Sequence, residues 1–502
     1  MSFSSFSCAS CLLRAFNIRK SYGDRVILDI DSLALYGGSK IGLVGQNGAG
    51  KSTLMAVLAG SIEPDCGRTE RSGIISVIRQ SQDSGLLRAE RSDTAQRERR
   101  AFSPGPLSQN PSGGELTRAA IDAALKARPD ILFADEPTTN LDMDGIRRLE
   151  GELRAFRGAI VLVSHDRALL DAVCGEIWHL EGGHIRTFPG SYTAWLEQSA
   201  RERDFALFEY DAYRREGKRL REAARKLNER SKKCLKPPSR MSPSEARINP
   251  DKGQIGQAAV RANAKAISKR ASMLEKKERP SDLPEIKMAL GVSSRVASPV
   301  TIRASGLSVY FGDRVLLDNA DFEIPTGKRT ILLGPNGSGK TTILDLIARG
   351  AAPVKIAPGT RIGFFRQNHE TLDPARTILE NARLGSILPE HEVRTILARL
   401  WIKGDEAHKK CGPLSGGERA KAAFAALFAS DLNTLILDEP TNHIDLYTAE
   451  SLQDLLMAWK GTLLLVTHDR RLAEATGDRL LIIKERKIKT FEGPLWDYAG
   501  FS

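Results

Sequence analysis

The chain contains an internal duplication. The stretch SYGDRVILDIDSLALYGGSKIGLVGQNGAGKST at residues 21–53 aligns without gaps with YFGDRVLLDNADFEIPTGKRTILLGPNGSGKTT at residues 310–342, at a constant offset of 289 residues. A chain of 502 residues, 41% of them hydrophobic, is long enough for two or three globular domains. The duplication therefore predicts two similar domains, one in each half of the chain.

Each copy carries a glycine-rich loop in a specific context. A β-rich run, KIGLVG or RTILLG, leads into Gly-x-x-Gly-x-Gly-Lys-Ser/Thr and then into an apolar helical pattern. This strand, loop and helix order is the one that a phosphate-binding P-loop requires, because the glycines turn backbone N–H groups inward and the helix N-terminus adds its positive end. The candidate nucleotide-binding residues of these loops are Gly45, Asn47, Gly48, Gly50, Lys51, Ser52, Thr53, Gly334, Asn336, Gly337, Gly339, Lys340, Thr341 and Thr342.

Within each loop the polar side chains have distinct expected roles. Lys51 and Lys340 would reach the β- and γ-phosphates of a nucleotide, whereas Ser52 and Thr341 would coordinate Mg²⁺. The sequence therefore predicts two sites for a nucleotide with Mg²⁺.

Two acidic residues close an apolar strand in each half. The strands are ILFADEP at 131–137 and TLILDEP at 434–440. Asp135 and Asp438 fit the magnesium-binding acid at the end of a β-strand, and the adjacent Glu136 and Glu439 are placed to polarise an attacking water. His165 and His468 follow, each 29 residues after its glutamate, so we expect them to act beside these carboxylates as catalytic residues.

A further motif lies between the P-loop and the acidic strand of each half. The stretches NPSGGELTR at 110–118 and PLSGGERAK at 413–421 contain Ser-Gly-Gly-Glu before a helical run. This motif resembles the signature of ATP-binding-cassette proteins. The resemblance implies that the signature of each half closes over the nucleotide held by the other half, so that two ATP molecules are sandwiched within one chain.

The same resemblance assigns further residues. Gln80 and Gln367 match the family's Q-loop, where the glutamine also binds the metal, and Asp142 and Asp445 match its D-loop. Tyr22 and Phe311 are placed like its adenine-stacking aromatic residues, although either could instead be a core residue of a strand. The signature residues implied to contact nucleotide are Ser112, Gly114, Glu115, Ser415, Gly417 and Glu418.

Both glutamates and both histidines are present, so we predict two hydrolytically competent sites. One residue departs from the family pattern, because Pro111 replaces the usual leucine before Ser112.

Other classes of protein fit the sequence poorly. Apolar runs such as AIVLVS at 159–164 are far shorter than the ~20 residues of a membrane helix. The first residues lack the charged start and apolar core of a secretory signal. The six cysteines are scattered, and only Cys8 and Cys11 have metal-like spacing, so we expect a reduced protein in the cytoplasm without a cysteine metal site.

The positive charge is concentrated between the two halves. The formal net charge is +12, and residues 201–290 alone contain 24 Lys and Arg against 13 Asp and Glu, an excess of 11. Such basic segments usually bind phosphate backbones or anionic membranes, and otherwise form a solvated helix surface. We interpret this one as a nucleic-acid-binding segment.

The central segment is predicted to be a helical hairpin. Between Ser191 and Leu235 the only Gly or Pro is Gly217, which favours a helix of roughly 40 residues and about 60 Å. KPPSR ends this helix, Ser242-Pro243-Ser244-Glu245 has the form of a helix start, and we expect a further break at NPDKG, residues 249–253, before a returning helix. Leu235, Lys236, Arg240 and Met241 at the tip are the candidate contact residues.

Twin cassettes joined by such a hairpin resemble the ABC-F class of translation factors. The resemblance implies binding to the ribosomal exit-tRNA site, with the hairpin directed toward peptidyl-tRNA and the large-subunit rRNA of the peptidyl-transferase centre. Only 32 residues separate Gln80 from Ser112, against 48 between Gln367 and Ser415, which leaves no room for an extra arm in the first half. With the stretch PSRMSPSEAR, this resembles the antibiotic-resistance branch, in which the hairpin displaces drug.

The fold class predicted is therefore α/β, with two P-loop ABC-type nucleotide-binding domains joined by an α-helical hairpin. We expect domains at 1–190 and 299–502, with the linker at 191–298, and a monomer without membrane spans. Two alternatives stay open: the ATPase subunit of a membrane importer or exporter with a separate membrane partner, and a DNA-repair ATPase. A general role in rescuing stalled ribosomes also stays open.

Overall fold

The computed structural model describes residues 10–79, 113–233, 250–274, 277, 296–312, 314–366, 372–442, 444–493 and 497–498. By internal packing the chain divides into two compact units, which are residues 1–195 with 283–502, and residues 196–282. The first unit contains both cassettes and the second contains the linker helices.

The first cassette is built on two sheets. Strand β1 (Cys11–Tyr22) pairs antiparallel with β2 (Arg25–Tyr36) and β4 (Cys66–Arg71). A six-stranded sheet has the order β5-β6-β7-β3-β8-β9 and is parallel except at β9. Its strands are β5 (Ile75–Ile78), β6 (Ile131–Asp135), β7 (Ala159–Val163), β3 (Lys40–Val44), β8 (Glu176–Glu181) and β9 (His184–Pro189).

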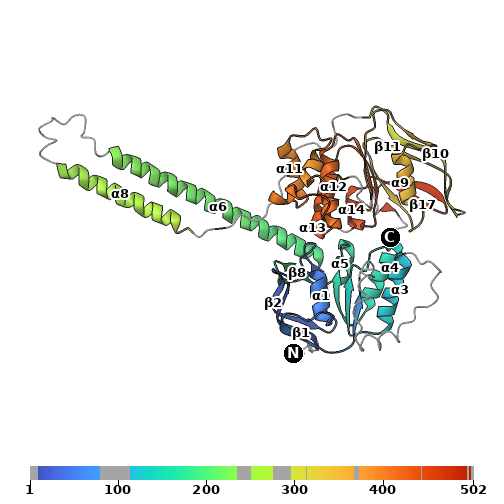
Figure 1. The fold of residues 1–502 in the computed structure, drawn as a ribbon, viewed down its shortest axis with the longest axis horizontal. Coiled ribbons are helices and arrows are strands. Elements are labelled where there is room, and N and C mark those ends of the chain that lie inside the picture. Colours follow the sequence, from blue (N-terminus) through green and yellow to red (C-terminus); the bar gives the residue numbers. More distant parts are fainter. Residues whose placement is uncertain are drawn as a thin grey trace, which may run out of the picture. The chain divides into compact units, whose positions relative to one another are not determined.

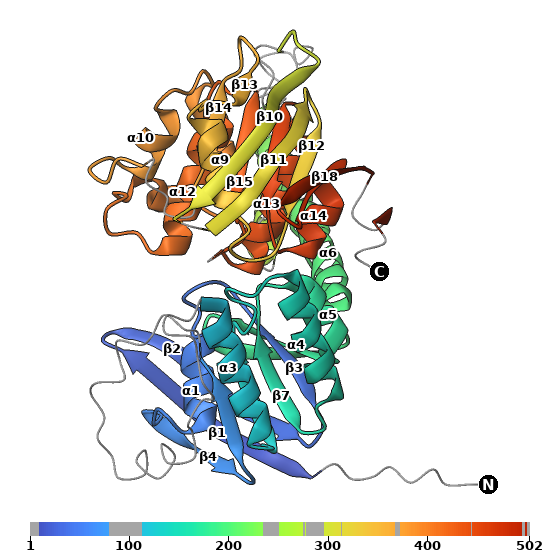
Figure 2. The ribbon, with the colours of Figure 1, turned by 90° about the vertical axis from the view of Figure 1, so that its right-hand side faces the viewer.

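Helices cover this parallel sheet. They are α1 (Lys51–Ala59), α3 (Gly113–Lys126), α4 (Met143–Ala155) and α5 (Arg167–Val173). Figure 2 shows α1, α3 and α4 beside the strands of the sheet. Every residue of β7 is buried, because a parallel strand covered on both faces needs an unbroken apolar sequence such as AIVLV.

The second cassette repeats this plan. Its antiparallel sheet has the order β11-β10-β13, and its six-stranded sheet has the order β14-β15-β16-β12-β17-β18. The strands are β10 (Val300–Phe311), β11 (Arg314–Pro325), β13 (Val354–Ile356), β14 (Ile362–Phe365), β15 (Thr434–Asp438), β16 (Thr462–Val466), β12 (Arg329–Leu333), β17 (Arg479–Lys484) and β18 (Lys487–Glu492). The helical elements are α9 (Lys340–Ala348), α10 (Ile378–Arg383), α11 (Glu390–Arg399), η2 (Gly404–His408), α12 (Gly416–Ala429), α13 (Leu446–Ala458) and α14 (Arg470–Thr476).

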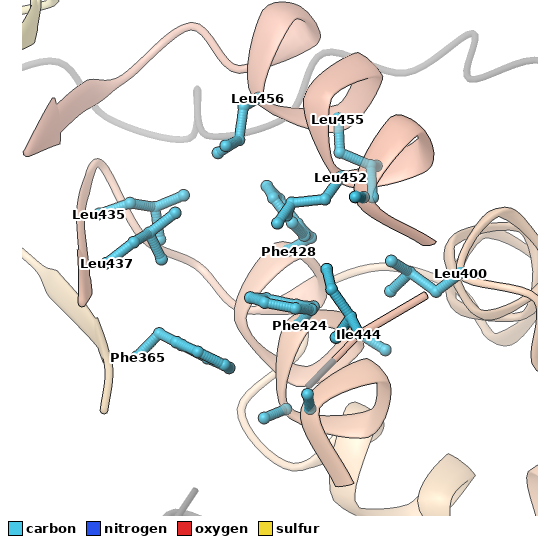
Figure 3. Close-up of a cluster of buried hydrophobic side chains, with 14 of the residues drawn as sticks. Phe365, Leu400, Phe424, Phe428, Leu435, Leu437, Ile444, Leu452, Leu455 and Leu456 are labelled. Atoms are coloured by element: carbon cyan, nitrogen blue, oxygen red, sulfur yellow. The ribbon is translucent and has the colours of Figure 1, made fainter. Parts of the chain in front are cut away.

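The core of the second cassette gathers around α12. Phe365 and Phe424 stack with ring centroids 4.3 Å apart, and Leu452, Leu455 and Leu456 of α13 belong to the same buried cluster (Figure 3). Alanines occupy several of the buried positions of α12, such as Ala420 and Ala423. This packing holds the N-terminus of α12, where the Ser-Gly-Gly-Glu motif lies.

Two long helices, α6 (Tyr192–Lys233) and α8 (Pro250–Ser272), lie side by side in Figure 1. They form the linker unit, except that the first four residues of α6 belong to the first unit. Glu209 on α6 forms an ion pair with Lys277 at 2.8 Å, which places the segment after α8 beside the first part of α6. The two helices are therefore antiparallel, as the sequence predicts.

One expectation for the linker is wrong. Helix α8 begins at Pro250 and runs through Gly253, so residues 250–253 are helical where we expect a break. Proline is compatible with the first turn of a helix, because the backbone N–H that it lacks would have no hydrogen-bond partner within the helix there. The predicted helix start at 242–245 and the tip residues Leu235, Lys236, Arg240 and Met241 lie outside the described residues.

The predicted fold class is confirmed: each half is an α/β domain with a P-loop, and two helices join them.

Candidate nucleotide-binding sites

Both P-loops connect the central strand of a parallel sheet to a helix. Gly50 and Gly339, the residues before α1 and α9, have φ of 105° and 94°, and Gly48 and Gly337 are also left-handed. A Cβ on Gly50 would lie 2.5 Å from Cγ2 of Ile27. Only glycine fits this turn without strain. The loops therefore have the glycine-dependent shape that a phosphate cradle needs.

The P-loop lysines are held by their own loops. Lys51 donates to the carbonyl oxygens of Gly45 and Gln46 at 2.8 and 3.0 Å, and Lys340 donates to that of Gly334 at 2.7 Å. Burial lowers the pKa of both lysines. A partly buried ammonium whose hydrogen bonds go to carbonyl oxygens of its own loop is suited to binding a phosphate anion.

A glutamate and a histidine meet in each cassette. Nε2 of His165 lies 3.2 Å from Oε1 of Glu136, and its backbone N–H donates to Oε2 at 3.1 Å. His468 and Glu439 repeat this arrangement at 3.2 Å for both contacts. Burial lowers the pKa of both histidines to about 4, so at neutral pH each imidazole is neutral and lies beside the carboxyl group without forming an ion pair.

The acids before these glutamates end the strands β6 and β15. The hydroxyl of Thr341 hydrogen-bonds to Asp438, and burial raises the pKa of Asp438. Hydroxyl and carboxylate oxygens are ligands that Mg²⁺ prefers. The pair Thr341 and Asp438 thus fits a magnesium ion, and Ser52 and Asp135 occupy the same positions in the first cassette.

Burial also raises the pKa of Glu439, to about 7. In a site that takes up a cation, this carboxylate becomes more acidic when the positive charge arrives.

The first candidate site is a cavity of about 760 Å³ lined by both cassettes. The ring of Tyr22 is 52% exposed at its rim, so it is not a core residue. The first cassette contributes Tyr22, Ile27, Asn47, Gly48, Gly50, Lys51, Ser52, Thr53, Asp135, Glu136, Thr138, Thr139, Asn140, Ile146, Val163, His165 and Asp166, and the second contributes Gly416, Gly417, Arg419, Glu439, Thr441, Asn442, His468 and Asp469. The first P-loop therefore faces the second signature.

The second candidate site is a cavity of about 570 Å³. Gly113, Gly114, Thr138, Asn140 and Leu141 of the first cassette line it with Phe311, Leu316, Asn336, Gly337, Gly339, Lys340, Thr341, Thr342, Asp438, Glu439, Asn442 and His468 of the second. Nδ2 of Asn336 donates to the carbonyl of Asn140 at 2.8 Å, and a Cβ on Gly114 would lie 2.6 Å from that carbonyl oxygen. Phe311 is 76% exposed, so this ring is not a core residue either.

Some predicted residues have structural contacts of their own. Ser415 and Glu418 form a capping box at the start of α12, with Oγ to Oε2 at 2.7 Å. Asp142 and Asp445 cap α4 and α13, and Asp445 also pairs with Lys421 at 3.1 Å. Glu115 lies in the first turn of α3. Gln80, Pro111, Ser112 and Gln367 lie outside the described residues.

Sequence reasoning missed several residues of these cavities. Thr138, Asn140, Thr441 and Asn442 follow the acidic strands in the matching stretches EPTTN and EPTNH, so the duplication itself contained the signal. Arg419 lines the first cavity, whereas Leu116 holds the equivalent position in the first signature.

Fold and cavities together define a P-loop nucleotide-binding protein with two composite sites. The family described as ABC transporter matches residues 28–139 and 317–442. The erythromycin resistance ATP-binding protein MsrA of Staphylococcus epidermidis is 32% identical, over 90% of this chain and 93% of its own length. The chain belongs to the ATP-binding cassette family, with two cassettes in tandem, and is an ATPase.

Two further similarities refine this picture. The ribosome protection protein VmlR of Bacillus subtilis is 28% identical, over 94% of this chain and 87% of its own length. A solved structure of an RNase-L Inhibitor superposes with a TM-score of 0.59 at 20% identity, covering 96% of this chain and 91% of that one, which shows a shared fold.

Among the described helices, none combines the length and the apolar character needed to cross a bilayer. Within the same described residues no cluster of three or more His, Cys, Asp or Glu side chains could hold a metal ion.

Proposed function

We propose that this ATPase is an ABC-F factor that binds the ribosome at the tRNA exit site. The observation that supports it is the pairing of two composite nucleotide cavities with a cationic helical hairpin. Binding of two ATP molecules would favour the closed form because each would contact both cassettes. Hydrolysis would then release the factor from the ribosome.

Several residues of the cavities have a proposed part in this cycle. Lys51 and Lys340 would bind the β- and γ-phosphates, with Mg²⁺ held by the Ser52–Asp135 and Thr341–Asp438 pairs. Glu136 and Glu439 would orient the attacking water, each positioned by its histidine. Tyr22 and Phe311 would stack on adenine, because their rings are exposed at the cavities.

The charge of α6 supports an RNA partner. Arg214, Lys218, Arg221 and Arg225 recur every three or four residues, which places them on one face of the helix, and all four are exposed. We call this set the α6 cation stripe. Two of its members have weak internal pairs, Lys218 with Glu222 at 4.0 Å and Arg225 with Glu229 at 3.1 Å. Surface pairs of this kind are easily exchanged for phosphate contacts.

Relatives named for ribosome protection and for erythromycin resistance support a narrower proposal. In it the hairpin enters the peptidyl-transferase centre, contacts large-subunit rRNA and peptidyl-tRNA, and causes bound antibiotic to dissociate. The protein would work in the cytoplasm as a monomer, with domains at 1–190 and 299–502 and the acting linker at 191–298.

A sedimentation experiment tests the partner. Ribosomes are pelleted through sucrose with the Glu136→Gln, Glu439→Gln protein, with and without ATP. We expect co-sedimentation only with ATP, because without hydrolysis the closed form persists. Replacing residues 234–249 by a short Gly-Ser linker should abolish it.

Protein that stays in the supernatant under both conditions would refute ribosome binding and turn the search to a membrane partner. For the narrower proposal, wild-type protein with ATP should restore translation inhibited by a peptidyl-transferase drug. Failure with every class of such drug would refute antibiotic displacement while leaving ribosome binding intact.

A further inference from the structure

The first turn of α6 is buried, although most of that helix is exposed. The side chains of Tyr192 and Trp195 are 1% and 3% exposed. Both belong to the compact unit that contains the cassettes. Their surroundings come from the first cassette and also from residues of the second cassette that follow them in the chain by more than 250 positions.

The hydroxyl of Tyr192 donates to Oε1 of Glu450 at 2.7 Å. Glu450 lies on α13, which begins directly after its cap, Asp445. Burial and the Glu450 carboxylate raise the pKa of Tyr192 far above its ordinary value, so the phenol remains a donor at any relevant pH. Such a charge-assisted bond fixes one end of α6 to the second cassette.

A second contact comes from Arg471. Its guanidinium bonds to Asp171 of α5 and to the hydroxyl of Thr193, and it lies over the Tyr192 ring at 5.9 Å. Asp171 in turn accepts from the backbone N–H of Thr193 at 2.7 Å. Arg471 is in the first turn of α14, three residues after His468, which lines both nucleotide cavities.

Aromatic rings complete the contact. The Trp195 ring lies 5.3 Å from those of His179 and Tyr192 and 6.2 Å from that of Tyr447. Tyr447, two residues after Asp445, also hydrogen-bonds to His179 at 2.8 Å. The start of α6 is thus contacted by side chains of α13 and α14 and by His179 of β8 and Asp171 of α5.

The two cassettes are not equivalent here. The two cassettes can be aligned by placing Glu136 on Glu439. In this alignment Tyr447 corresponds to Asp144, Glu450 to Arg147, and Arg471 to Ala168. The donor and acceptor chemistry that holds the hairpin is therefore particular to the second cassette and is not a by-product of the cassette fold.

We propose that Glu450 and Arg471 form a clamp on the start of α6, through which the nucleotide state of the composite sites sets the position of the hairpin. The clamp residues lie within five residues of Asp445 and His468 along rigid helices. When nucleotide draws the cassettes together, α13 and α14 move. The start of α6 moves with them, because Tyr192 is hydrogen-bonded to Glu450 of α13 and Thr193 to Arg471 of α14. Tyr192 and Arg471 are positioning residues, and the proposal rests on the proposed function only for what the hairpin then does.

Amide hydrogen exchange tests the clamp without ribosomes. In the full-length Glu136→Gln, Glu439→Gln protein, we expect ATP to slow exchange in residues 192–200 about tenfold, the effect of one well-formed hydrogen bond. Adding Tyr192→Phe, or Arg471→Ala, should reduce this ATP effect to within about twofold. Protection of 45–53 and 334–342 by ATP should persist in both variants.

Tyr213→Phe removes a hydroxyl from the same helix outside the clamp and should retain the full ATP effect. Arg471→Lys keeps the charge and should restore part of it, which a merely structural defect would not allow. The clamp would be overturned if ATP did not slow amide exchange at residues 192–200 of the Glu136→Gln, Glu439→Gln protein. It would also be overturned if ATP slowed this exchange equally with and without Tyr192→Phe. If ribosome pelleting fails while the exchange result holds, the partner is wrong and the clamp stands.

Discussion

At the two proposed catalytic carboxylates, backbone and side chain are arranged together. Glu136 and Glu439 have φ of 49° and 48°, a left-handed conformation that costs a non-glycine residue free energy. In return the carboxylate of each faces the backbone N–H and ring of a histidine 29 residues later. The strain lies at the residue proposed to orient water, where a fixed direction of the side chain matters most.

The pKa of Glu439 leads to a prediction about stability. Because the folded pKa is about 7 and the ordinary value is 4.5, this group favours folding below pH 4.5 and loses that contribution as pH rises through 7. Glu439→Gln mimics the protonated form, so without nucleotide it should raise the melting temperature at pH 8 by a few degrees and change it little at pH 5. Thermal unfolding at both pH values measures this.

The control is Glu63→Gln, at an exposed glutamate, which should be neutral at both pH values. A Glu439→Gln protein with the same gain at pH 5 as at pH 8 would show that burial does not suppress ionisation there.

At the scale of elements, α6 is the helix whose surface can be tested directly. Substituting glutamine for Arg214, Lys218 and Arg221 removes three cations of the stripe without changing helix propensity much. If these residues meet RNA phosphates, ribosome affinity should fall and the slope of log affinity against log salt should decrease by about 2 to 3. Pelleting with ATP at several salt concentrations gives the slope.

A matched triple variant, with glutamine at Arg303, Lys355 and Lys489 of the second cassette, removes the same charge from other exposed positions. Equal changes of slope in the two variants would mean that overall charge, rather than the stripe, governs binding.

Elements were predictable where a local pattern determines them. The P-loops, the acidic strands and α6 follow from glycine spacing, apolar runs and helix-favouring composition, all of which act over a few residues. The start of α8 could not be predicted in this way. Proline is allowed both in a break between helices and in the first turn of a helix, and only packing decides which of the two forms at Pro250.

Functional residues also differ in whether a local sequence pattern identifies them. Lys51 or Glu136 could be found by motif, whereas Tyr192, Glu450 and Arg471 have no periodicity and meet only through long-range folding. Asp445 shows the opposite problem: the family motif assigns it to nucleotide, while its carboxylate bonds Thr448 and Lys421.

For the whole molecule, a buried ion pair joins the two cassettes. Arg167 lies 3.3 Å from Asp469, and the two side chains are 3% and 6% exposed. Arg470 and Glu150 form a second pair at 3.1 Å. Arg167, Asp469 and Arg470 each follow one of the two histidines by one or two positions, and Asp469 also lines the first cavity.

Breaking the first pair should weaken this contact. Asp469→Asn can still cap α14 but leaves the Arg167 charge uncompensated, which for a buried pair costs about 3 to 5 kcal/mol. We expect a lower melting temperature and slower ATP hydrolysis. The double variant Arg167→Met, Asp469→Asn should recover much of the stability, because both charges of the pair are removed together. Thermal unfolding measures the stability, and phosphate release measures the rate of ATP hydrolysis. An Asp469→Asn protein as stable as the wild type would show that the pair is dispensable.

The continuity of α6 has a mechanical consequence. Its 42 residues form a stiff rod of about 63 Å, held at one end by its first turn. A tilt of only about 5° at that end would carry the far end about 5 Å, close to the distance between neighbouring phosphates along an RNA strand. If the proposed clamp tilts this end of the helix, small adjustments around Tyr192 would be amplified with distance along the rod.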